Sequence, residues 1–224
     1  MFTFSVFSYM FATFVCWLYS FKLYQNYRFK KTPTFIFSFL GEFLIGLGGF
    51  IFGVSSFSAP FNLSILKVGY IIGSATLFIA FVIIMKGLVF LFNENKLLKI
   101  APVSILLFGI VSTLINIFYF PYANPHIDEY KLIHWGQHFV PRIIFLISMV
   151  IAAGIVGISF LIKKSEEKKQ KLKSLFISLS FILAGLGGGL IIFLNDPLGL
   201  FIAYSMLIIG FLFGFLISFV KYLF

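Results

Sequence analysis

Charged residues are scarce in this chain: Asp, Glu, Lys and Arg make up 11% of its 224 residues, and only seven are acidic. A soluble domain averages about 25% charged residues, so this composition excludes an ordinary soluble domain. Cysteine occurs once, at Cys16, which excludes an intrachain disulfide. The net charge of +10 does not indicate nucleic acid as a partner. Its basic residues lie in short segments between apolar runs, where they set orientation in a membrane.

Sequence motifs for several chemistries are also missing. No phosphate-binding loop or nucleophile elbow occurs, so nothing indicates an enzyme. No histidine lies inside an apolar run, which argues against a haem held between helices by two histidines. The N-terminus has neither a basic region nor a small-residue cleavage site after its apolar run. We therefore interpret it as a retained helix rather than a signal peptide.

Apolar residues are abundant, at 61% of the chain, and they gather in seven runs. About 20 consecutive apolar residues cross the hydrocarbon core of a bilayer as a helix. The sequence therefore predicts an all-α bundle of seven transmembrane helices, a single domain over 1–224 in the cell membrane, with the lipid bilayer as its surroundings. The predicted spans are 2–21, 35–57, 66–92, 103–122, 142–162, 174–194 and 198–220.

The basic residues favour one orientation of this bundle. Fourteen of them lie at the connections 22–34, 93–102 and 163–173, at the end of the third run, or after the last run. Only Lys67, Lys131 and Arg142 lie at the other side. Because cytoplasmic connections carry the excess of Lys and Arg, the N-terminus is expected outside and the C-terminus inside.

Two of the runs resemble each other. Residues 174–194 align with 35–55 at a shift of 139 positions, with 7 of 21 residues identical, including the run GLGG at 46–49 and 185–188. The same shift places 142–162 on 3–23 with three identities. This pattern indicates a parallel 3+1+3 repeat, with the fourth helix as the inverting linker. Chance similarity in a chain rich in Phe, Leu and Ile is the alternative.

The longest connection on the outer side, 121–141, carries all three histidines. Asn124 and Pro125 are typical of a helix start, so we expect a short helix over 125–139 at the membrane surface. His126, His134 and His138 would then share one face with Tyr130, because they recur every four residues. Three interpretations stay open: amphipathic filling of an interfacial helix, a pH-sensitive or ligand-gating cluster, or a metal site completed by an acidic neighbour.

Apart from charges at their first residues, the apolar runs contain Glu42, in the second run, and Lys86, in the third. Both are predicted about 10 Å below the cytoplasmic surface. There they either form an ion pair with each other or take part in ligand binding, coupling or proton transport. Alternatively, Lys86 reaches the surface and leaves Glu42 alone. Polar residues in the outer half of the bundle are candidates for an outward pocket: Ser55, Ser56, Ser74, Thr76, Asn116, Tyr119, Tyr204 and Ser205.

The stretch LYQNYRFKKTPTFIFSFLGEFLIGLGGF, at 23–50, resembles the seven-helix membrane sensor regions that precede prokaryotic histidine kinases. This resemblance implies a sensor or receptor-like module that binds a small or lipophilic ligand from outside and signals to a partner chain. The 3+1+3 layout is also similar to that of SWEET-type sugar transporters, which makes a small-solute or ion transporter the second hypothesis. A structural subunit of a membrane complex, or of a homo-oligomer, is the third.

Overall fold

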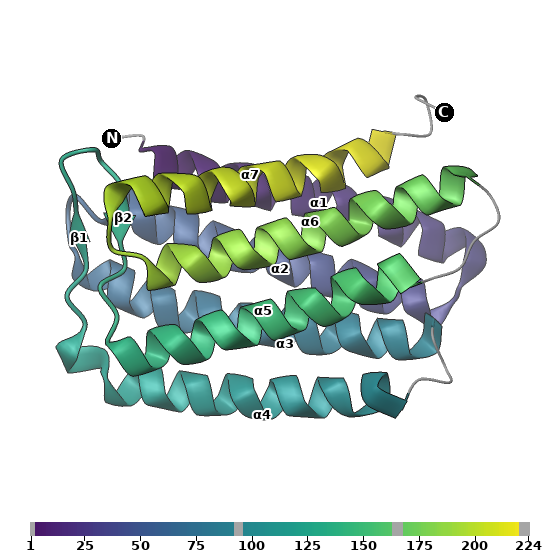
Figure 1. Cartoon of the computed structure of the whole chain (residues 1–224), viewed down its shortest axis with the longest axis horizontal. Coiled ribbons are helices and arrows are strands. Elements are labelled where there is room, and N and C mark those ends of the chain that lie inside the picture. Colours follow the sequence, from purple (N-terminus) through teal and green to yellow (C-terminus); the bar gives the residue numbers. More distant parts are fainter. Residues whose placement is uncertain (1–2, 92–95, 163–167, 220–224) are drawn as a thin grey trace.

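The computed structural model describes residues 3–91, 96–162 and 168–219. Seven long helices run alongside one another in this part of the chain, and a short β-hairpin covers one end of the bundle (Figure 1). We call this end the hairpin end. The elements are α1 (Phe4–Lys30), α2 (Pro33–Ser58), α3 (Ser64–Leu91), α4 (Lys96–Phe118), the 3-10 turn η1 (Phe120–Tyr122), β1 (His126–Ile127), β2 (Ile133–His134), α5 (Phe139–Ile162), α6 (Lys168–Phe193) and α7 (Pro197–Phe219).

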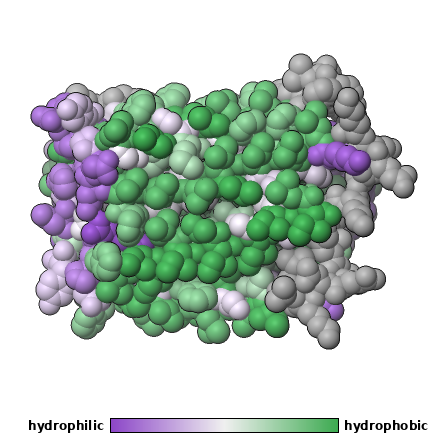
Figure 2. Space-filling view, in the orientation of Figure 1, coloured by the Kyte–Doolittle hydropathy of each residue, from purple (hydrophilic) through white to green (hydrophobic). Residues whose placement is uncertain are grey.

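The described residues form seven helices that are long and apolar enough to cross a membrane. Large apolar side chains are exposed along them, as a surface in contact with lipid requires. Figure 2 shows this apolar band, with hydrophilic residues gathered at the hairpin end. The prediction of an all-α, multi-pass membrane protein with seven spans is confirmed.

The first helix is longer than its predicted span. It continues through Lys22 and Arg28 to Lys30, so most of the predicted connection 22–34 is helical. Lys31 ends the helix in the left-handed conformation, with φ of 49°, and its N–H donates to the Tyr27 carbonyl oxygen at 2.7 Å. Pro33 then starts α2. Polar residues outside the bilayer can continue a helix, whereas a proline is tolerated in the first turn of a helix and not in its interior, so Pro33 begins a new one.

The helices pack as two groups of three, which we call the first unit (α1, α2 and α3) and the second unit (α5, α6 and α7). In each unit the middle helix contacts both of its neighbours extensively. Between the units, α1 contacts α7, and α3 contacts α5 more sparsely. Helix α4 lies at the side of the bundle against α3 and α5.

Glycines on α2 and α6 allow this close packing. A Cβ atom on Gly49 would lie 2.9 Å from the Thr13 Oγ1 of α1, and one on Gly53 would lie 3.0 Å from the Met10 Cε. On the other side of α2, a Cβ on Gly48 would lie 2.9 Å from the Leu77 Cδ2 of α3. Small residues at such contacts let helix backbones approach in a membrane, where packing replaces the hydrophobic effect as the driving force.

One of these contacts is made against the backbone of the neighbouring helix and yields a stability prediction. A Cβ on Gly187 of α6 would lie 2.6 Å from the backbone nitrogen of Leu207 and 2.7 Å from the carbonyl oxygen of Ala203, both on α7. Because a backbone cannot move aside, Gly187→Ala is expected to destabilise the fold by about 1–3 kcal/mol. Gly154→Ala is the matched control, since no atom lies within 4 Å of its added Cβ. Thermal unfolding in detergent should give a lower midpoint for Gly187→Ala alone; equal midpoints would contradict this packing.

Candidate functional site

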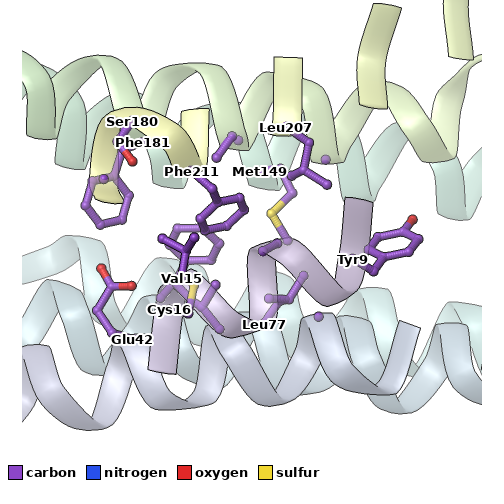
Figure 3. Close-up of a pocket in the computed structure, with 18 of the residues that line it drawn as sticks. Tyr9, Val15, Cys16, Glu42, Leu77, Met149, Ser180, Phe181, Leu207 and Phe211 are labelled. Carbon is purple, nitrogen blue, oxygen red and sulfur yellow. The ribbon is translucent and has the colours of Figure 1, made fainter. Parts of the chain in front are cut away.

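A cavity of about 110 Å³ lies in the centre of the bundle. Residues of α1, α2 and α3 line one side of it and residues of α5, α6 and α7 line the other, so it lies between the two units. Helix α4 contributes no lining residue within the described part of the chain. Figure 3 shows lining side chains that project into this space from both units.

The lining of this cavity is almost entirely apolar. Aromatic rings come from both units, and they are Tyr9, Tyr19, Phe52, Phe81, Phe145, Phe181 and Phe211. Small residues make room between them, and they are Ala12, Gly49, Ala184, Gly185, Gly188 and Gly214. Binding sites for small molecules are commonly built in this way, from apolar walls with a few polar groups.

Among the described residues, Glu42 is the one acidic residue in the lining of the cavity. Its side chain is 8% exposed, and the Cys16 thiol of α1 lies beside its carboxyl group. No ion pair joins Glu42 to a cationic side chain among the described residues, where His134 and Asp128 form the only pair found. The predicted pair between Glu42 and Lys86 is therefore absent.

The helical period explains why these two residues do not meet. Gly41 faces Ile84 of α3, so the next residue, Glu42, points about 100° away from that contact and toward α1. Lys86 lies two residues beyond Ile84, about 200° around α3, and is exposed. The spacing of Gly41 and Gly48, two turns apart on one face, is the sequence signal that orients Glu42.

The hairpin contacts residues that line the cavity. Trp135, which is 1% exposed, donates a hydrogen bond from Nε1 to the Tyr9 hydroxyl at 3.1 Å. Its ring meets the Phe52 ring edge to face at a centroid distance of 5.0 Å. Next to it, the Ile133 backbone N–H donates to the Ser5 hydroxyl at 3.1 Å. Tyr9 and Phe52 also line the cavity, so these two residues connect the hairpin to it.

The prediction of a helix over 125–139 was wrong. These residues form an antiparallel hairpin in which His126 pairs with His134 and Ile127 with Ile133. The Asp128 carboxylate accepts a hydrogen bond from the Leu132 N–H at 2.7 Å, and Lys131 adopts a φ of 63° in the turn. Such a turn offers the backbone an alternative to a helix. The residues after this turn, including Ile133, are buried, and this burial favours the hairpin over the helix.

In the hairpin, the three histidines do not share one helix face as predicted. The rings of His126 and His134 stack at 4.4 Å, and His134 Nε2 lies 3.0 Å from Asp128 Oδ2. His138 stacks instead on Tyr119 at 4.2 Å. Within the described residues, no group of three or more His, Cys, Asp or Glu side chains is arranged to hold a metal ion. The structure does not assemble the predicted metal site.

The polar residues proposed for an outward pocket lie outside the lining of the cavity. Ser74 and Thr76 donate hydrogen bonds to carbonyl oxygens of their own helix. Tyr204 is buried, with its hydroxyl 3.5 Å from the Ile133 carbonyl oxygen of the hairpin. Asn116 is 1% exposed, and its amide has no hydrogen-bond partner among the described residues.

Asp128 is expected to hold the hairpin in place. Asp128→Ala removes the acceptor of the Leu132 N–H and the partner of His134. Loss of such charged hydrogen bonds costs about 1–3 kcal/mol, which is enough to raise the fraction of molecules with an open hairpin about tenfold. Trypsin cleavage after the exposed Lys131 should accelerate accordingly in Asp128→Ala, but not in Glu129→Ala, which removes an exposed neighbouring carboxylate. Cleavage at the wild-type rate in both variants would contradict this role.

No family model, no curated protein and no solved structure matches this chain. Its function is therefore inferred from the geometry of its own residues.

Proposed function

We propose that this chain is a membrane sensor or receptor-like module that binds a small lipophilic ligand in the central cavity. The observation that supports this most directly is the lining, which is apolar on all sides and comes from six helices of two units. A ligand that partitions into the bilayer suits such walls, because burying its apolar surface is favourable. In this proposal the lysine-rich connections lie in the cytosol and the hairpin lies outside the cell membrane.

Contacts at the hairpin support a sensing role. Tyr9 and Phe52 line the cavity with one face and contact Trp135 with another. A ligand that displaces either ring therefore also displaces Trp135, which anchors the hairpin. The occupied and empty states then differ at the surface, where a partner protein can recognise them.

The equivalent placement of matching residues supports the 3+1+3 repeat. In the GLGG runs, Gly46 and Gly185 face the first helix of their units, at Cys16 and Ala153. Gly48 and Gly187 face the third helix of their units. Gly49 and Gly188 both line the cavity. We propose that the two units arose by duplication and are related by an axis along the bundle that passes through the cavity.

The binding proposal is tested by filling the cavity. Gly188 lines it, and a Cβ at this position meets only the Leu207 Cδ1, at 3.9 Å. Gly188→Leu therefore places a side chain in the space proposed for the ligand, whereas Gly154→Leu is the control outside the cavity. Trp17→Phe serves as the background for both, because it leaves Trp135 as the only tryptophan.

Bromobenzene is the probe, since it is small and apolar. Bound in the cavity, it displaces Tyr9 or Phe52, the lining rings on which Trp135 packs, and so changes the fluorescence of Trp135. In nanodiscs this change should be saturable in the background and in Gly154→Leu, and without saturation in Gly188→Leu. A change that rises linearly in all three variants would reflect partition into lipid alone and would overturn the proposal.

The position of the cavity between two units favours a small-solute or ion transporter as the second candidate. Parallel repeats around a central site are one way to build transporters. Proteoliposomes with a proton gradient should then accumulate radiolabelled tetramethylammonium, which crosses lipid poorly. Glu42→Gln should remove the dependence on the gradient, since Glu42 is the one acidic residue among the described residues that line the cavity. Uptake no greater than in liposomes without protein would exclude this candidate.

A further inference from the structure

The Glu42 carboxyl group occupies an unusual place within the bundle. It projects from α2 into the cavity between the two units (Figure 3). The Cys16 thiol, which is only a weak hydrogen-bond donor, lies beside it. An ionised carboxylate in such surroundings is unfavourable unless a positive charge is nearby.

Among the described residues, no ion pair is found between Glu42 and a cationic side chain. Lys86, its predicted partner, is exposed on the far side of α3. The cavity therefore contains one half of an ion pair. A bound cation would complete it and remove the cost of the isolated charge.

The rest of the lining also suits a cation. At the shift of 139 positions that relates the two units, the residue equivalent to Glu42 is Phe181, and both line the cavity. They project into it from opposite units in Figure 3. One unit thus provides a carboxylate and the other an aromatic ring at matching positions. Ligand cations are attracted to the faces of aromatic rings, and this attraction strengthens where water is excluded.

The size of the cavity limits the ligand further. Its volume is about 110 Å³. An apolar cavity of about 150 Å³ in another protein binds benzene. The cavity therefore has room for a single ring, or a short alkyl chain, that carries one amino group.

We propose that the central cavity binds a small lipophilic amine in its protonated form, with the ammonium group paired to Glu42 and the apolar part held by the aromatic walls. This inference rests on the proposed function, because it names the class of ligand for the same cavity. It assigns Glu42 the role of the residue that selects a cation over a neutral molecule of equal shape.

The test compares two probes of nearly equal size, benzylamine and benzyl alcohol, of which only benzylamine is charged at neutral pH. Binding is measured by calorimetry on the protein in nanodiscs, with empty nanodiscs subtracted. The wild-type protein should bind benzylamine at least about tenfold more tightly than benzyl alcohol, as expected for a buried charged hydrogen bond. This comparison needs no variant and so does not depend on the folding of one.

Variants then locate the preference at Glu42. Glu42→Gln should abolish the preference for benzylamine, while benzyl alcohol still binds, which also shows that the cavity is intact. Glu129→Gln makes the same chemical change at an exposed site and should leave both affinities unaltered.

The outcomes separate the two proposals. Equal affinity of the wild-type protein for both probes, or a preference that persists in Glu42→Gln, would overturn the assignment of a cation and leave the lipophilic site standing. Binding of neither probe, together with a fluorescence change with bromobenzene that does not saturate, would overturn the assignment and the proposed function together.

Discussion

Close approach of helix backbones at glycine is the interaction on which this bundle depends. In a membrane the hydrophobic effect does not drive helices together, so packing must do so. On α2 and α6, glycines bring both neighbouring helices close and define two compact units. Between the units, bulky side chains such as Phe78 and Phe145 meet instead. The space left unfilled between the units is the cavity. One packing rule thus explains both the tight parts of the structure and its hollow centre.

The site combines this hollow with a single carboxyl group. Gly41 turns one face of α2 toward α3, and Glu42 is thereby directed to the cavity rather than to Lys86. At the hairpin end, Trp135 rests on Tyr9 and Phe52, which are themselves part of the wall. The cavity, the Glu42 carboxyl group and the hairpin are therefore connected through a few residues. This continuity supports the proposed sensor over a purely structural subunit.

The sequence predicts the seven helices because a membrane span must satisfy local requirements of length and apolarity. The glycine strips on α2 and α6 could be found for the same reason. The hairpin could not, since Asn124 and Pro125 are good helix starters and only the burial of Ile133 and Trp135 in the bundle outweighs them. The direction of Glu42 depends on how α2 is rotated against its neighbours, and a count of residues along the chain does not reveal that rotation.

Helix α4 has a consequence for how the chain enters the membrane. It lines no part of the cavity within the described residues, and it lies at the side of the bundle. Successive helices of a polytopic chain cross the bilayer in alternating directions, so three crossings end on the face opposite to the one where they began. A fourth crossing returns the chain to the starting face, and α5, α6 and α7 then insert in the same sense as α1, α2 and α3. Without α4 the second half of the chain would insert in the opposite orientation, and the Glu42 carboxyl group and the Phe181 ring, which now line the same cavity, would lie at different depths.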